Sequence, residues 1–329
     1  MTLAETLRRT PPLLVAAIVM TMMALGVQAQ PYPNKPIRLI MPWPPGGPAE
    51  GIARPVMERL SQALGRPIII EPKAGAAAMI GTQYVARQPA DGYTLLLSHV
   101  GSTTIAPALQ KQLAYDPIKD FEHITLIASA TLVLVVRPEL PFVSIPELIA
   151  YAKVNPGKLA YGSMGTGSTS HLAGELLSMM AGINLLHVPY NGVPPVLQDL
   201  LGGRIQGTFI GYLPVQAHVK AGTLRLIAIA SSTNRSSIAP DIPTVSETLS
   251  EYEADVWYGL AAPAGTPKEI VHRLYTEVSK ILREPQVMAK LRETGSEPGG
   301  MAPDAFLAKI RQDTARWAKV VEGAHIERQ

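Results

Sequence analysis

The residues best suited to chemistry form one glycine- and hydroxyl-rich loop, Gly162-Ser163-Met164-Gly165-Thr166-Gly167-Ser168-Thr169-Ser170-His171. Its glycines allow a tight backbone, and its serine and threonine hydroxyls are hydrogen-bond donors. Ser168, Thr169 or Ser170 is expected to cap the helix that follows. Free N–H groups, hydroxyls and a helix N-terminus together hold an anion without a cationic side chain. The alternative is a capped helix with no ligand.

A second candidate loop follows the apolar run of residues 37–41, which prolines bound on both sides and which predicts a buried strand. A turn containing Gly46 and Gly47 comes next, and a helical pattern begins near Ile52. In open α/β sheets, ligands bind at such turns, where the strands end. The alternative is an ordinary strand-to-helix connection.

The sequence contains no recognisable catalytic or metal-binding motif. Its seven histidines are scattered, it has no cysteine, and neither H-E-x-x-H nor G-x-S-x-G occurs. Ser170 and His171 are adjacent, but neighbours on a helix point in different directions. Ser170 also replaces the third glycine of a dinucleotide-binding motif. We predict no catalytic residue, no metal and no cofactor. An exported hydrolase acting on a small carboxylate derivative is the alternative.

Strand-like and helical patterns alternate along the chain, which favours an α/β fold of mainly parallel sheets flanked by helices. The apolar run of residues 124–136 is too long for one average strand, and we interpret it as a crossing into a second domain. A new α/β series follows it, and residues 255–261 resemble a strand returning to the first domain. We predict one lobe from residues 30–130 plus 255–329 and another from residues 131–254. Two crossings suit a hinge with a ligand cleft between the lobes.

The first 29 residues have the pattern of an export signal. Arg8 and Arg9 precede the apolar run of residues 13–27, and Val27-Gln28-Ala29 ends it with small residues. The run is shorter than the ~20 residues needed to span a bilayer. We predict cleavage after Ala29 and a periplasmic location. The net charge of +3, without any run of Lys or Arg, argues against a nucleic-acid partner.

Seven motifs, in order along the mature chain, resemble those of the Bug-type extracytoplasmic solute receptors of the tripartite tricarboxylate transporter family. They are Tyr32-Pro33-Asn34-Lys35-Pro36-Ile37-Arg38, Pro42-Trp43-Pro44-Pro45-Gly46-Gly47, Asp91-Gly92-Tyr93-Thr94-Leu95, the loop of residues 165–170 with His171-Leu172-Ala173-Gly174-Glu175, Val188-Pro189-Tyr190-Asn191-Gly192, Asp241-Ile242-Pro243-Thr244 and Pro263-Ala264-Gly265-Thr266-Pro267.

The resemblance implies a two-lobed periplasmic binding protein of type II-like fold, a monomer that binds a small organic carboxylate and delivers it to membrane transporter subunits. In this family the carboxylate is held mainly by backbone N–H groups, hydroxyls and ordered waters. Carried over by position, the ligand-binding residues are Trp43, Gly46, Gly47, Pro48, Ala49, Ser98, Val100, Gly101, Ser102, Gly165, Thr166, Gly167, Ser168, Thr169, Ser170, His171, Tyr190, Asn191, Gly192 and Phe209.

The first loop departs from the family pattern, in which the two glycines are usually followed by two hydroxyl residues and an aspartate. Here Gly46-Gly47 is followed by Pro48-Ala49-Glu50, so two hydroxyls are missing and Pro48 has no N–H to donate. We therefore hypothesise that the second lobe holds most of the ligand, or that the ligand presents a less polar end to the first. Trp43 either stacks on a ring of the ligand or packs the lobe interface.

Overall fold

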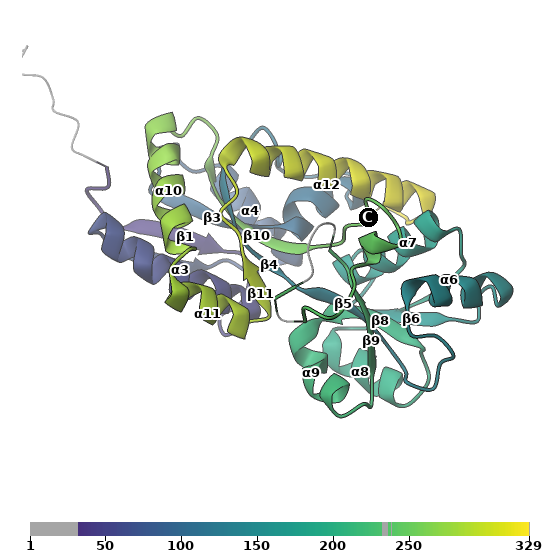
Figure 1. Cartoon of the computed structure of the whole chain (residues 1–329). Helices are drawn as coiled ribbons and strands as arrows, with labels where there is room; N and C mark the ends of the chain where they lie inside the picture. Colours follow the sequence, from purple (N-terminus) through teal and green to yellow (C-terminus); the bar gives the residue numbers. More distant parts are fainter. Residues whose placement is uncertain (1–31, 232–235, 238, 329) are drawn as a thin grey trace, which may run out of the picture. The chain divides into compact units, whose positions relative to one another are not determined.

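The computed structural model describes residues 32–231, 236–237 and 239–328, so the predicted export signal and its cleavage site lie outside the described residues. The chain divides into two compact units, Met1–Asn34 and Lys35–Gln329. Only residues 32–34 of the first are described, and they form no helix or strand. All elements named below belong to the second unit (Figure 1). Within the described part of the chain, no helix combines the length and apolar character required to cross a membrane.

The first sheet has six strands in the order β11-β4-β10-β3-β1-β2. Its strands are β1 (Ile37–Met41), β2 (Ile68–Pro72), β3 (Thr94–His99), β4 (Phe121–Ala130), β10 (Val256–Pro263) and β11 (Ser296–Pro298). β1 pairs in parallel with β2 and β3, whereas β10 lies antiparallel between β3 and β4. Leu95, Leu96 and Leu97 are successive residues of β3 and all are buried. Both faces of the sheet are therefore covered, as expected for a strand that reads as one apolar run.

The second sheet has five strands in the order β7-β6-β8-β5-β9. Its strands are β5 (Leu132–Val136), β6 (Ala160–Ser163), β7 (Leu186–Pro189), β8 (Gly207–Gly211) and β9 (Arg225–Ile229). β6 pairs in parallel with β7 and β8, and β5 lies antiparallel between β8 and β9.

Most strands of each sheet point the same way, and the exceptions are β5, β10 and the short β11. The expectation of mainly parallel sheets therefore holds for strand direction, but both sheets contain antiparallel pairs. β5 and β10 are the first strands after the chain passes from one sheet to the other. A chain that leaves one sheet at the carboxyl ends of its strands enters the facing sheet from that same side, so its next strand runs in reverse.

The passage from the first sheet to the second takes a single residue, Thr131, between β4 and β5. Its N–H donates to the carbonyl of Gly295 at 3.0 Å, and its carbonyl accepts from Tyr212 N–H at 3.1 Å. The return passage ends at β10, and just before this strand Ala254 N–H donates to the carbonyl of Ala230 at 3.0 Å. Residues 124–136 thus contain the passage between the two sheets, and residues 256–261 belong to β10 of the first sheet.

Helices flank each sheet. Around the first sheet lie α3 (Pro48–Leu64), α4 (Met79–Ala86), α5 (Ala106–Leu109), α10 (Lys268–Ile281), α11 (Pro285–Glu293) and α12 (Pro303–Gly323), and around the second lie α6 (Ile145–Val154), α7 (Thr169–Ala181), α8 (Val193–Leu201) and α9 (Tyr212–Lys220). Short helical turns occur at Ala76–Ala78, Gly101–Ile105 and Val245–Glu247. The long α12 contacts α5 and β4 on one side and α7 on the other, so it ties the elements of the two sheets together (Figure 1).

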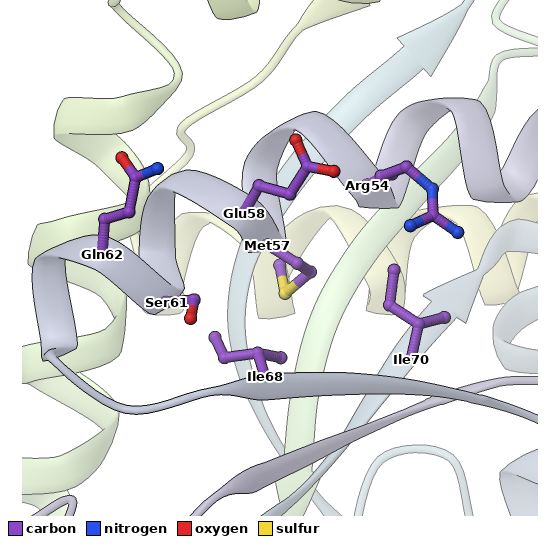
Figure 2. Close-up of a pocket in the computed structure, with 7 residues that line it drawn as sticks. All are labelled: Arg54, Met57, Glu58, Ser61, Gln62, Ile68 and Ile70. Atoms are coloured by element: carbon purple, nitrogen blue, oxygen red, sulfur yellow. The ribbon is translucent and has the colours of Figure 1, made fainter.

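A surface groove of about 400 Å³ runs between α3 and the edge strand β2 (Figure 2). Met57 from the helix and Ile68 and Ile70 from the strand face this groove, and Arg54 and Glu58 lie along it. No residue of the second sheet contributes to its lining.

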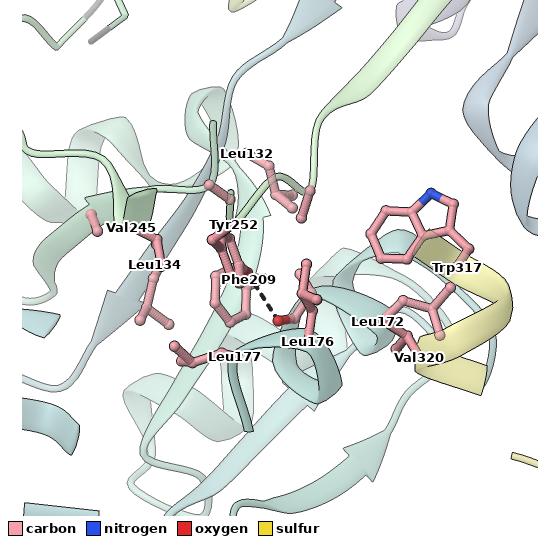
Figure 3. Packing of buried hydrophobic residues seen from close by; sticks show 14 of the residues in the cluster. Leu132, Leu134, Leu172, Leu176, Leu177, Phe209, Val245, Tyr252, Trp317 and Val320 are labelled. Carbon is pink, nitrogen blue, oxygen red and sulfur yellow. Dashed lines mark hydrogen bonds between the residues drawn. The ribbon is translucent and has the colours of Figure 1, made fainter. Parts of the chain in front are cut away.

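The largest hydrophobic cluster runs through elements of both sheets without a break. On the α7 side, Phe209 stacks on Tyr252 with ring centroids 6.3 Å apart, and Leu172 and Leu176 pack near Trp317 of α12 (Figure 3). Tyr252 is fully buried, and its hydroxyl donates to the carbonyl of Ala173 at 2.9 Å. The partner satisfies the one polar atom of a side chain that otherwise packs as a hydrophobe.

We predict that Gly174→Ala destabilises the protein, although alanine is usually the better helix residue by about 1 kcal/mol. A Cβ at position 174 would lie 2.2 Å from Cε2 of the buried Tyr161, so the packing between α7 and β6 would have to open. Overpacking of this kind costs roughly 1–3 kcal/mol, and we expect a loss near 2 kcal/mol in the free energy of unfolding by denaturant titration.

The matched control is Gly51→Ala in α3, where the nearest atom is a threonine methyl of Thr294, 3.1 Å from the added carbon. Gly51 is exposed, and this variant should stay within about 1 kcal/mol of the parent protein. Equal stability of the two variants would contradict the predicted contact at Tyr161.

Candidate functional site

The candidate ligand-binding cleft has a volume of about 620 Å³. It is lined by residues of the turns and helices that follow strands of both sheets. The first-sheet wall consists of Trp43, Ala76, Ala77, Met79, His99, Gly101, Ile105, Ala106, Leu109 and Gln110, and the second-sheet wall of Met164, Thr166, Gly167, Ser168 and Thr169. None of these lining residues carries a formal charge at neutral pH if His99 is neutral. A ligand in this cleft therefore meets backbone groups, hydroxyls, one amide and apolar surface.

The second-sheet wall is built by the turn from β6 into α7. Ser168 caps the helix: its Oγ accepts from His171 N–H at 3.3 Å and donates to the carbonyl of Gly165 at 2.6 Å. The first intrahelical bond runs from Leu172 N–H to the carbonyl of Ser168. The N–H groups of Thr169 and Ser170 therefore have no acceptor within the helix, as at any helix start. Such groups, together with the helix dipole, favour a negative charge.

The buried side chain of His171 holds the β6–α7 turn in place. Its Nδ1 accepts a hydrogen bond from Gly167 N–H at 3.0 Å, which requires an unprotonated Nδ1. His187 stacks on His171 with ring centroids 3.7 Å apart, and His187 Nε2 lies 2.7 Å from Ser163 Oγ. Burial lowers the pKa of both histidines to about 4, and for His171 the neighbouring His187 adds to this shift. Both rings are therefore neutral at pH 7, and His171 acts as an acceptor for the loop.

The floor of the first-sheet wall is a cluster of three aromatic rings, Trp43, His99 and Tyr258. Trp43 meets His99 edge-on at 5.0 Å and Tyr258 edge-on at 5.7 Å between ring centroids. His99 Nδ1 accepts from Gly101 N–H at 2.9 Å, and burial lowers the pKa of His99 to about 4. Two contacts thus fix the indole ring of Trp43, which is half-buried and lines the cleft.

The loop before α3 binds a carboxylate of its own chain. Glu50 Oε2 accepts from Gly46 N–H at 2.7 Å, and Glu50 Oε1 pairs with Arg54. These bonds, that to Gly46 first, hold the pKa of Glu50 below its usual range. Gly46 and Gly47 line a separate groove against α11 and do not line the cleft.

A turn of left-handed alanines completes the first-sheet wall. Ala76, Ala77 and Ala78 have φ values of 44°, 49° and 75°. Side chains with a Cβ pay about 1–2 kcal/mol per residue in this region, so the surrounding structure must hold the turn in place. Ala76 and Ala77 are exposed at the cleft, and their backbone is open to a ligand.

Six of the residues predicted for ligand binding lie together on the cleft: Trp43, Gly101, Thr166, Gly167, Ser168 and Thr169. Another group is buried behind this lining: Ser98, Val100, Ser102, Ser170 and His171. Phe209 is also buried, and it packs on Tyr252 in the core (Figure 3).

The remaining predicted residues lie in the connecting turns. Gly165 shapes the β6–α7 turn through its carbonyl, Pro48 begins α3, and Ala49 is buried beneath it. Tyr190, Asn191 and Gly192 form the turn between β7 and α8, where the Tyr190 hydroxyl donates to Asp199 at 2.9 Å. Their side chains do not line the cleft.

Sequence reasoning did not single out eight of the lining residues: Ala76, Ala77, Met79, Ile105, Ala106, Leu109, Gln110 and Met164. His99 lies within the turn of residues 98–102, which the family resemblance nominates. The alanine turn had a weak signal in its glycine and proline neighbours, and Ile105 and Leu109 read only as apolar helix positions.

Other hollows suit a ligand less well. A hollow of about 690 Å³ near Thr131 is lined by Glu253, Asp255, Glu297 and Lys309, but Lys309 is paired with Glu253 and Glu297 accepts from Ser237. Among the residues that the structure describes, no group of three or more His, Asp or Glu side chains is placed to hold a metal.

The chain matches the model of the tripartite tricarboxylate transporter family receptor over residues 52–326. BugT of Bordetella pertussis is 35% identical over 300 residues, which cover 91% of this chain and 92% of BugT. A solved R. palustris protein with adipate is 35% identical, with a TM-score of 0.73 over 90% of this chain and 99% of that one. MatC of Rhodopseudomonas palustris, solved with malate, is 30% identical, with a TM-score of 0.69 over 88% of this chain and all of MatC.

We predict that stability falls as the pH drops from about 6.5 towards 4. Burial lowers the pKa of His99, His123, His171 and His187 to about 4, whereas the same groups in the unfolded chain titrate near 6.5. The unfolded state then binds more protons, so acid favours it. Their contribution is complete above pH 6.5 and is lost progressively below it. Melting temperatures at pH 7.5 and 5.5 measure the loss.

Asp255 has the opposite effect on stability, because burial raises its pKa to about 7. The folded state binds this proton more tightly than the unfolded state, so protonation of Asp255 stabilises the protein as the pH falls. Comparing variants isolates the histidines: His187→Gln should show a smaller fall in melting temperature between the two pH values than the parent protein. The control is His272→Gln at an exposed position, which should leave the fall unchanged. An unchanged fall in His187→Gln would refute the assignment.

Proposed function

Because the chain belongs to the Bug-type receptors of the tripartite tricarboxylate transporter family, we propose that it captures a small organic carboxylate in its cleft and delivers it to a membrane transporter of that family. The protein is a solute-binding receptor. Its carboxylate ligand and the delivery of that ligand to a membrane transporter are both proposed.

The observation that carries the proposal is the wall formed by the β6–α7 turn. This wall presents the start of α7 to a cleft with no lining cation, and its donors are the Thr169 hydroxyl and the N–H groups of Thr169 and Ser170, which lack an acceptor within the helix. A carboxylate is satisfied by such a set of neutral donors. The two R. palustris neighbours were solved with the carboxylates adipate and malate, which supports a carboxylate as the ligand.

Residues 30–130 with 255–329, and residues 131–254, are proposed as the two lobes that close on the ligand. Each contains one of the two sheets, and the passages between the sheets lie at Thr131 and near Ala254. Membership of a family of periplasmic receptors implies export, and we propose cleavage after Ala29. The mature protein is proposed to act as a monomer.

We propose that no bond is made or broken in this cleft. His171 is the histidine nearest to the hydroxyl-rich turn in sequence, and its Nδ1 is already engaged by Gly167 N–H. The Ser168 hydroxyl donates to the Gly165 carbonyl, so it is not paired with a base. Ser163 Oγ lies 2.7 Å from His187 Nε2, but Ser163 is fully buried and neither residue lines the cleft. The exported-hydrolase alternative therefore has no accessible nucleophile on this wall.

The test is isothermal titration calorimetry of the purified mature protein with adipate, malate, hexanoate and benzoate. We expect one-to-one binding of at least one of these probes and at least tenfold weaker binding in Gly167→Ala. An added Cβ at this position would lie 2.5 Å from Leu109 Cδ1, so the Leu109 side chain, which also lines the cleft, would have to move.

The matched control is Gly182→Ala at the other end of α7. Gly167 and Gly182 both have positive φ, 79° and 62°, so both variants carry the backbone strain of a left-handed alanine. Nothing lies within 4 Å of a Cβ at position 182, and binding should be unchanged there. No binding of any probe by the parent protein would overturn the proposed function, and full affinity in Gly167→Ala would overturn the site.

A further inference from the structure

We propose that the preferred ligand is a flat aromatic monocarboxylate, with its carboxylate on the β6–α7 turn and its ring against Trp43. This inference rests on the proposed function and narrows it to a ligand class. It differs from the dicarboxylates adipate and malate that the two R. palustris neighbours were solved with.

Only the second-sheet wall of the cleft is suited to an anion. The start of α3 would be the natural anion site of the first-sheet side, but Glu50 already accepts from Gly46 N–H there. Pro48, at the first position of α3, has no N–H to offer. Gly46 and Gly47 also face the groove against α11. The strongest anion-binding element of this side is therefore occupied by the chain's own carboxylate.

A second ligand carboxylate, placed against the first-sheet wall, would meet only neutral groups. The polar groups of the first-sheet wall are the Gln110 amide, the N–H groups of the Trp43 and neutral His99 rings and the backbone at Ala76 and Ala77, and no Lys or Arg side chain is among the lining residues. Taking a further charge out of water is costly unless it is paired or fully hydrogen-bonded. A ligand with one charge avoids that cost.

The rest of the ligand would meet a largely apolar surface. Trp43, Met79, Ile105, Ala106, Leu109 and Met164 line the cleft. Methionine sulfur and an aromatic face both make favourable contacts with a ring. Trp43 is held edge-on by His99 and Tyr258, so its indole is fixed before a ligand arrives and loses little freedom on stacking. A volume of about 620 Å³ accommodates a substituted benzene ring.

The tryptophans provide a direct readout. Trp257 and Trp317 are 0% and 1% exposed in the core, whereas Trp43 lines the cleft. Titration with benzoate should change the emission of Trp43, and this change should disappear in Trp43→Phe while calorimetric affinity stays within about threefold. Trp43→Ala should weaken benzoate at least tenfold. In the parent protein, benzoate should bind at least tenfold more tightly than adipate or malate.

Folding of each variant is checked by its melting temperature, and Trp43→Phe, which keeps a ring, remains decisive if Trp43→Ala is unstable. Adipate or malate binding as tightly as benzoate would overturn the inference and leave the receptor function standing. A Trp43→Phe variant that keeps the emission change would likewise overturn the placement of the ring. Failure of all carboxylate probes would instead overturn the proposed function itself.

Discussion

The two backbone crossings between the sheets are the constraint on which the cleft depends. Each crossing leaves one sheet where its main strands end and enters the other from the same side, so β5 and β10 run in reverse. The carboxyl ends of the main strands in the two sheets consequently face one another. The turns after β1, β3 and β6, which supply most of the lining, are brought together by strand direction, and their own side chains need not attract each other.

The cleft is lined by neutral groups, and buried histidines hold two of the turns that line it. His171 accepts from Gly167 and His99 accepts from Gly101, so each histidine orients one turn of the lining. A protonated ring would lose that acceptor, and burial disfavours the charged form in both cases. The same burial that keeps the rings neutral therefore fixes the geometry of the turns that face the ligand.

Much of the fold followed from sequence, because apolar runs and turn residues are local signals. The apolar run of residues 124–136, which contains the passage between the sheets, is of this kind. β11 was missed because a strand of three residues leaves no periodicity. Residues 72–78 read as a loop, but the left-handed backbone of Ala76–Ala78 did not, because alanine favours a right-handed helix. Phe209 was carried over by position alone, but whether its ring faces a ligand or the core depends on packing with Tyr252. Ordered loop residues can be nominated from sequence, whereas the direction of their side chains cannot.

The two sides of the cleft differ in their preference for an anion, so the two ends of a bound ligand would not be equivalent. An anion is favoured at the start of α7, while the start of α3 is already neutralised by Glu50 and its partner Arg54. A symmetric pair of helix starts would hold a ligand with a charge at each end in either orientation. On the proposed function, one of them is occupied from within the chain, so the charged and uncharged ends of a ligand would have different places and the chain would set the ligand's orientation.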